Sequence, residues 1–120
     1  MSIMVVDDSS VMRKIVIRSI RQAGYGDYDV EQAEDGAEAL AMIKDEVPEV
    51  VLSDWNMPNM NGLELLKALR ADSIDVPFGF VTSESTTEQR SMAVAAGANF
   101  LLSKPFTADD LSDRLGEVLD

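Results

Sequence analysis

Polar and charged side chains stand directly behind the apolar, β-branched segments of this sequence. The residues at these segment ends are Asp7, Asp8, Asp54, Thr82 and Lys104. If the segments are neighbouring strands, three carboxylates meet one hydroxyl and one ammonium. Carboxylates about 5 Å apart repel by roughly 1–3 kcal/mol per pair, depending on how well water screens them. A cluster of this kind favours a bound cation.

The composition decides which cation suits such a cluster. The chain contains no cysteine and no histidine, so the side-chain ligands available are oxygens. Oxygen ligands suit hard ions, and a site with few acids and room for water suits Mg²⁺ better than the cage that Ca²⁺ takes. The sequence therefore predicts Mg²⁺ beside Asp7, Asp8 and Asp54.

Phosphoryl transfer is the chemistry that this set of residues could perform. A carboxylate can act as a nucleophile and form an aspartyl phosphate. A divalent ion beside Asp54 would offset charge on a phosphoryl group attached to it. Thr82 could hydrogen-bond to the phosphoryl oxygens, and Lys104 could neutralise them.

Composition and charge argue against several other functions. The net charge of −12, from 10 basic and 22 acidic residues, would repel nucleic acid and acidic membrane surfaces. No apolar run approaches the roughly 18 residues that would span a bilayer. The N-terminus lacks a basic stretch and becomes acidic after Val6, which is typical of folded structure and not of a signal peptide. We expect a cytoplasmic protein with a single domain over residues 1–120.

Five apolar segments are predicted strands, and segments of helical periodicity lie between them. The strands are expected at 2–6, 29–33, 49–53, 77–82 and 99–103. Apolar residues at helical spacing mark four helices; they are Met12, Ile15, Val16, Ile20 and Ala23, then Ala39, Leu40, Ile43 and Val47, then Leu65, Leu66 and Leu69, and finally Leu111, Leu115, Val118 and Leu119. A weaker, alanine-rich pattern at 86–98 predicts one further helix.

Strands that alternate with helices indicate an open α/β fold. Right-handed crossovers place the helices on both faces of a parallel sheet. The strands of such a sheet end at the same edge, and ligands bind outside that edge where the winding reverses. This geometry would bring the residues at the segment ends together.

Four motifs resemble the receiver domain of two-component response regulators, in order and spacing, over essentially the whole chain. They are VVDDS at 5–9, SDWNMPNMNGLELLK at 53–67, TSE at 82–84 and KPF at 104–106. The loop around Asp54 is most similar to that of the stand-alone chemotaxis members of this family. The resemblance implies a doubly wound, flavodoxin-like, five-stranded parallel sheet of order 2-1-3-4-5.

The resemblance also implies roles for the site residues. Asp54 would be the phosphoacceptor, because it matches the acid that receivers phosphorylate. Mg²⁺ would be held by Asp7, Asp8, Asp54 and the backbone carbonyl of Asn56.

A second group of residues would respond to the phosphoryl group. Thr82 and Lys104 resemble the pair that senses it in receivers. The peptide bond between Lys104 and Pro105 is expected to be cis, which proline tolerates at low cost. Asn56 and Glu84 flank the phosphoryl position in such domains and are expected to tune the access of water.

By the same resemblance, the protein is a phosphorylation-controlled binding module. It would not be an enzyme in the ordinary sense, since it would catalyse only its own phosphorylation and dephosphorylation. A histidine kinase would supply the phosphoryl group, and an effector protein such as a flagellar motor switch component would respond to it. A phosphatase is a further expected partner, and a monomer is the expected state.

One position departs from the family pattern. Receivers commonly carry Tyr or Phe three residues before the lysine, where the ring turns inward when the threonine moves, but here that position is Leu101. Phe100 precedes it, and strand alternation predicts that its ring lies on the other face of the sheet. Output is then expected to rely on the loop after Thr82 and on the fourth and fifth helices.

Other functions share parts of this pattern. An Mg²⁺-dependent phosphohydrolase with an aspartyl nucleophile would carry a second acid where Asn56 stands. A flavodoxin-like cofactor carrier would need a Thr- or Gly-rich phosphate loop after the first strand, where the sequence reads DDSS. The chain could also be the receiver half of a larger regulator.

Overall fold

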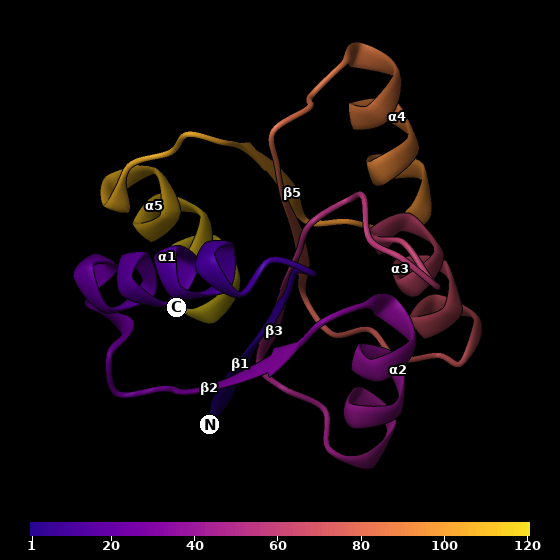
Figure 1. Cartoon of the computed structure of the whole chain (residues 1–120), viewed down its shortest axis with the longest axis horizontal. Coiled ribbons are helices and arrows are strands. Elements are labelled where there is room, and N and C mark those ends of the chain that lie inside the picture. The colour runs from indigo at the N-terminus through magenta and orange to yellow at the C-terminus, as the bar shows by residue number, and fades with distance from the viewer.

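A computed structural model describes all residues, 1–120, as a five-stranded parallel sheet between two layers of helices (Figure 1). The strands are β1 (Ser2–Val6), β2 (Asp29–Ala33), β3 (Val50–Ser53), β4 (Phe78–Thr82) and β5 (Phe100–Ser103). Their order in the sheet is β2-β1-β3-β4-β5, and each neighbouring pair is parallel. The predicted doubly wound α/β fold is confirmed.

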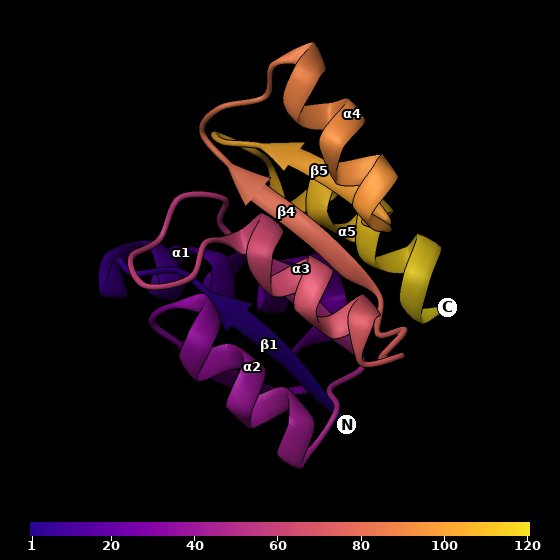
Figure 2. The same cartoon turned by 90° about the vertical axis from the view of Figure 1, so that its right-hand side faces the viewer.

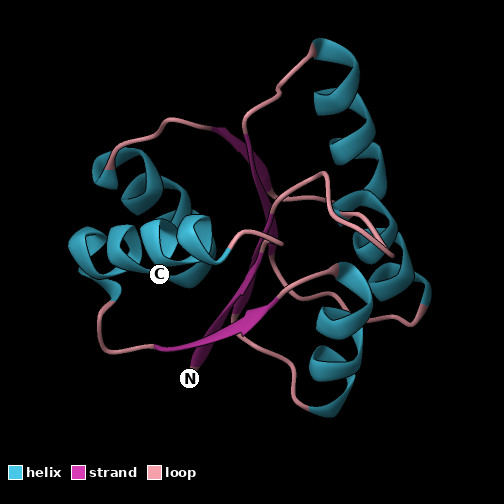
Figure 3. Ribbon diagram, viewed as in Figure 1, coloured by secondary structure: helices cyan, strands magenta, loops and turns pink.

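The helices divide between the two faces of the sheet. The α-helices are α1 (Ser10–Ile20), α2 (Gly36–Asp45), α3 (Gly62–Ala71), α4 (Thr87–Ala96) and α5 (Ala108–Leu119). A short π-helix, η1 (Arg21–Tyr25), continues α1 and includes Ala23. In Figure 3 the sheet is seen edge-on, with α1 and α5 on one side and the other helices opposite. Figure 2 looks onto α2, α3 and α4, which lie side by side across their face. No helix is both long enough and apolar enough to cross a membrane.

The predicted element limits hold to within one or two residues, with one clear error. β1 and β2 have the predicted bounds, and the other strands begin one residue later than expected. Val47 was expected to continue the second helix, but α2 ends at Asp45 and Val47 is 50% exposed. The cause is Pro48, because a residue that precedes proline is disfavoured in helical conformation.

Alternation along the strands divides the core into two clusters. On the α2–α4 face, side chains such as Met4, Phe80 and Leu101 pack together. On the α1–α5 face, side chains such as Val5 and Phe100 form the second cluster. Phe100 and Leu101 therefore lie on opposite faces, as predicted. Because both faces are covered, the central strands are apolar along most of their length.

A glycine in β4 makes room for the ring of Phe100. Gly79 pairs with Phe100 in the β4–β5 register. A methyl group on Gly79 would overlap the aromatic ring. Both residues are buried, so neither has open space into which it can move. The ring of Phe100 thus fills the volume that a side chain at position 79 would need.

We predict that Gly79→Ala lowers the free energy of unfolding by about 1–3 kcal/mol, the usual cost of overpacking a filled core. Phe100→Leu should relieve much of this cost, so the double variant should be more stable than the sum of the two single changes indicates. Urea unfolding of the four proteins measures the coupling. Additive costs would show that the two side chains do not compete for space.

Candidate functional site

The carboxyl ends of β1 and β3 bring three acids together. Val6 pairs with Ser53, and the Asp54 N–H donates to the Val6 carbonyl at 2.9 Å, so the two strands end side by side. One carboxylate oxygen each from Asp7, Asp8 and Asp54 lies within 4.8 Å of the others. These acids, predicted from their positions behind the strands, could together hold a divalent cation.

Lys104 provides the positive charge nearest to this cluster. Its Nζ lies 3.2 Å from Asp7 Oδ2 and 3.7 Å from Asp54 Oδ2. The Lys104–Pro105 peptide bond is cis, as expected. The Lys104 N–H donates to the Thr82 carbonyl at 2.8 Å, which fixes the lysine beside the end of β4. The ammonium therefore lies between two of the acids and partly offsets their charge.

The hydroxyl of Thr82 is buried and held within its own loop. The residue is 1% exposed, and its Oγ1 accepts a hydrogen bond from the Glu84 N–H at 3.3 Å. The hydroxyl makes no hydrogen bond to the side chain of Asp54 or of Lys104. Thr82 thus lies at the predicted edge of the sheet, but its side chain is not joined to the acids in this state.

The side chain of Asp8 neither caps α1 nor holds another part of the structure. The N-cap of α1 is Ser9, whose hydroxyl accepts from the Met12 N–H at 3.2 Å. The Ser9 N–H donates to Asp7 Oδ1 at 2.9 Å. Asp8 is exposed and takes part in no side-chain hydrogen bond or ion pair, so its carboxylate is available to a ligand.

Asn56 lies in the loop that joins β3 to α3, two residues after Asp54, and its side chain is exposed. Glu84 is also exposed and follows the end of β4. Both residues lie near the edge of the sheet where the acids meet. The part of the Asn56 carbonyl in metal binding stays a prediction.

One residue that supports the site was not anticipated. Arg13 of α1 is 9% exposed, and its Nη1 donates to the backbone carbonyl of Asp7 at 2.6 Å. Its Nε donates to Gln32 Oε1 at 3.0 Å. Arg13 shares the buried face of α1 with Val16 and Ile20, so a charged residue at an inward helical position was the signal that could have identified it.

The pKa of Asp54 is raised above its ordinary value. Burial is the largest cause of the raised pKa of Asp54, and the negative charges of Asp7 and Asp8 add to it. The ammonium of Lys104 and the hydrogen bond from the Trp55 N–H, at 2.7 Å, act in the opposite direction. Because the unfavourable effects prevail, a cation at this position would stabilise the ionised site.

An apolar hollow of about 460 Å³ borders the site on the side of Lys104. Its lining residues come from α1 and from the loops that follow β4 and β5; they are Met12, Ile15, Ser83, Lys104, Pro105 and Phe106. The hollow therefore adjoins the site at Lys104, and none of the three acids lines it.

Comparison with known proteins identifies the family. Residues 3–116 match the family model of the response regulator receiver domain. The chain belongs to this family.

Several curated and solved proteins similar to this receiver domain are named as chemotaxis proteins. Chemotaxis protein CheY-3 of Vibrio cholerae is 40% identical over 100% of this chain and 92% of that protein. A chemotaxis protein CheY homolog of Campylobacter jejuni is 43% identical over 99% and 92% of the two chains. The solved structure of chemotaxis protein CheY4 of Vibrio cholerae superposes with a TM-score of 0.87 at 38% identity and covers 98% of both chains.

Leu101 is buried on the α2–α4 face of this receiver domain. The leucine is 7% exposed and packs in the cluster on the α2–α4 face. Two residues further along β5, Ser103 Oγ accepts a hydrogen bond from Arg90 Nη2 of α4 at 3.4 Å. A polar contact between α4 and the end of β5 thus lies close to the leucine that replaces an aromatic ring.

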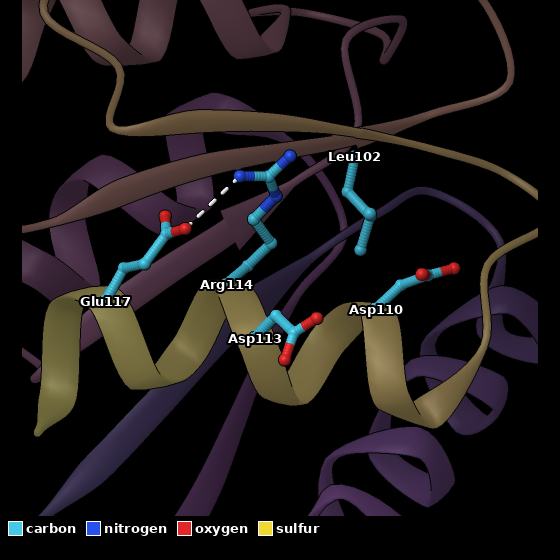
Figure 4. Close-up of a pocket in the computed structure, with 5 residues that line it drawn as sticks. All are labelled: Leu102, Asp110, Asp113, Arg114 and Glu117. Atoms are coloured by element: carbon cyan, nitrogen blue, oxygen red, sulfur yellow. Dashed lines mark hydrogen bonds and ion pairs between the residues drawn. The ribbon is translucent and has the colours of Figure 1, made fainter.

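A second hollow of the receiver domain lies on α5 and also measures about 460 Å³. Asp7, Asp8 and Asp54 do not line it. Its lining is mostly acidic and consists of Leu102, Asp110, Asp113, Arg114 and Glu117 (Figure 4). Arg114 and Glu117 form an ion pair at 3.3 Å. None of the predicted site residues lines this hollow.

We predict that Asp54→Asn stabilises the metal-free receiver domain at neutral pH. The folded-state pKa of Asp54 is raised, so the folded state loses stability as the pH rises from the ordinary aspartate value through the raised one. The free energy of unfolding of the variant should exceed that of the wild type at pH 7 by about 1 kcal/mol, which is the repulsion between two well-hydrated carboxylates. The difference should vanish below the ordinary aspartate pKa.

Chemical unfolding in chelator across a pH series measures this difference. Asp27→Asn, which changes an exposed carboxyl outside the site, should show no comparable pH dependence. A variant less stable than the wild type at neutral pH would mean that attraction to Lys104 outweighs burial and repulsion.

Proposed function

We propose that this receiver domain, over residues 1–120, accepts one phosphoryl group on Asp54 and thereby switches the binding of a protein partner. The observation that carries the proposal is the position of Asp54, whose carboxylate lies with those of Asp7 and Asp8 within 4.8 Å and 3.7 Å from Lys104 Nζ. A nucleophile, a place for a cation and a counter-charge are thus present together.

The donor set suits Mg²⁺. Asp7, Asp8, Asp54 and the carbonyl of Asn56 would hold the ion through oxygen atoms, and the chain has no cysteine or histidine to favour a softer metal. When bound, the ion offsets negative charge on the transferring phosphoryl group. Asp7 and Asp8 cannot act as the acceptor as readily. The buried carboxylate of Asp7 is hydrogen-bonded to Lys104 and to the Ser9 N–H, and the carboxylate of Asp8 is exposed and has no cationic partner.

In the transfer step, an Asp54 carboxylate oxygen forms a bond to phosphorus as the bond between phosphorus and the histidine nitrogen of a kinase breaks. The released imidazole keeps the electron pair of the broken bond. The Lys104 ammonium lies close enough to Asp54 to neutralise an oxygen of the transferred group. Water reverses the modification when it attacks the phosphorus, which restores the carboxylate and releases phosphate. The chain catalyses only these two reactions of its own side chain.

The relatives suggest the kind of pathway. Proteins named for chemotaxis match nearly the full chain at about 40% identity, so we propose a histidine kinase as donor and an effector such as a flagellar motor switch component as target. A phosphatase would shorten the lifetime of the phosphoryl group. The net charge of −12 disfavours nucleic acid as a direct partner. We place the protein in the cytoplasm as a monomer.

The switch would begin at Thr82. A phosphoryl oxygen on Asp54 would compete for the hydroxyl, which now only accepts a hydrogen bond from the Glu84 N–H. Movement of Thr82 would shift the loop that leads to α4. With Leu101 in place of a ring, the change reaches the surface through this loop and through the contact of Arg90 with Ser103.

We predict that the wild-type protein gains one phosphoryl group from acetyl phosphate and that the reaction requires a divalent ion. Asp54→Asn should abolish the gain, because the amide is a poor nucleophile and a poor ligand. Intact-mass measurement detects the added group. The Asp27→Asn variant, which should be phosphorylated like the wild type, serves as the control. Equal labelling of the Asp54→Asn protein would disprove the assignment, and continuous release of phosphate from a phosphate ester would favour a phosphohydrolase instead.

We predict that Thr82→Ala impairs the switch severely and Leu101→Ala mildly. The hydrogen bond of Thr82 to the phosphoryl group does not depend on a ring at position 101. Leu101→Tyr should increase the difference in partner affinity between the two forms of the protein. A buried ring that stabilises one conformation would add to the few kcal/mol that separate the two conformations. Partner affinity with and without beryllofluoride, a phosphoryl mimic, measures these effects. If Leu101→Ala removes the gain while Thr82→Ala keeps it, the leucine is itself the switch.

A further inference from the structure

The loop that carries Asn56 contains a strained turn. Asn59 has a φ of 65°, in the left-handed region that side chains rarely adopt. The Met60 N–H donates to the Pro58 carbonyl at 2.7 Å, which closes a three-residue turn around Asn59. Turns of this kind with a positive central φ are rare and persist only when the surrounding structure holds them.

The N-terminus of α2 holds this turn in place. Asn59 Nδ2 donates to Asp35 Oδ2 at 2.8 Å, and the Gly36 N–H donates to the Met60 carbonyl at 2.9 Å. A side chain at position 36 would lie 2.6 Å from the Met60 carbonyl oxygen, so the close approach requires glycine. The loop and the helix are thus joined at the strained residue and at the residue that follows it.

Asp35 performs two tasks with its two oxygens. Its Oδ1 accepts from the Glu38 N–H at 2.8 Å and caps α2, while its Oδ2 binds Asn59. These hydrogen bonds lower the pKa of Asp35, so it stays ionised at neutral pH. Ala39 and Ile43 anchor α2 in the core. The turn is therefore fixed relative to the core of the protein through this carboxylate and through the Gly36 N–H.

The residues on either side of Asn56 are fixed at both ends. On one side, the Trp55 carbonyl accepts from the Gly62 N–H at 2.9 Å. On the other side, the turn at Pro58–Met60 is held by α2. Only Asn56 and Met57 lie between these two points, so the direction of the Asn56 carbonyl depends on both.

We propose that Asp35 and Asn59 are positioning residues that set the Asn56 carbonyl toward the ion bound by Asp7, Asp8 and Asp54. Neither residue belongs to the acid cluster, and both act through the loop. This inference rests on the proposed Mg²⁺ site and extends it to the hydrogen bond between the β3–α3 loop and α2.

Two variants remove the hydrogen bond between Asp35 and Asn59 while keeping the other structural role of the residue that is changed. Asn59→Gly keeps the positive φ, removes the side-chain hydrogen bond and changes no charge. Asp35→Ser keeps a capping oxygen for α2 but leaves none for Asn59. Asp35→Asn is the conservative variant, because asparagine caps equally well and the Asn59 amide can turn over and accept from it. Asp72→Ser, which removes an exposed acid paired with Lys44, is the matched charge control.

The experiment titrates Mg²⁺ into each metal-free protein and follows the fluorescence of Trp55, which adjoins Asp54. We expect Asn59→Gly and Asp35→Ser each to weaken Mg²⁺ binding about 10-fold, the low end of the roughly 10- to 100-fold effect of residues that support metal ligands. The double variant Asp35→Ser/Asn59→Gly should bind Mg²⁺ no more weakly than the weaker-binding single variant, because the two changes remove the same hydrogen bond. Asp35→Asn and Asp72→Ser should stay within about twofold of the wild type, the scatter expected for distant surface changes.

Hydrogen exchange of the amides at 56–61 without ions provides a second readout, and faster exchange is expected in the same two variants. Wild-type binding that both variants retain unchanged would overturn the inference and leave the proposed function standing. A wild-type protein that binds no Mg²⁺ would overturn both.

Discussion

Mutual repulsion of three carboxylates is the interaction that the rest of this structure must withstand. Asp7, Asp8 and Asp54 approach within 4.8 Å of one another because the parallel register of β1 and β3 sets their backbones side by side. Burial is the largest cause of the raised pKa of Asp54, and the charges of Asp7 and Asp8 add to it. The fold offsets part of this cost with Lys104 and holds the end of β1 through Arg13. The remaining imbalance is what a cation or a modification of Asp54 can act on.

The general plan of the fold follows from the sequence because it depends on local patterns. Strands covered on both faces give continuous apolar segments, and a parallel sheet then collects whatever follows those segments at one edge. That reasoning places Asp7, Asp54 and Lys104 together without knowledge of any distance. It fails at Val47, where the helical spacing continues but Pro48 ends the helix.

The supporting contacts were not predictable in the same way. Asn59 and Asp35 are 24 positions apart in sequence, and nothing in their spacing indicates that a loop would fold onto a helix N-terminus. Arg13 meets Asp7 through a backbone carbonyl, which is present at every residue and gives no sequence signal. The roles of the Asn56 carbonyl and of Thr82 as a sensor are likewise properties of a liganded state, and they stay predictions. α4 illustrates a related point, since it buries only Ala93 fully and is held mainly by its own caps and by a few polar contacts. An element attached so lightly can shift at small energetic cost.

The fit between Gly79 and the Phe100 ring bears on how this chain can diverge and be recombined. Because the ring fills the space above a residue without a side chain, a larger residue at one position is compatible only with a smaller one at the other. Sequence drift at the two sites is therefore coupled, and each change opens the way for its counterpart. A chimera that takes β5 from another receiver domain would inherit a ring-sized gap or a clash unless the matching β4 residue is transplanted with it.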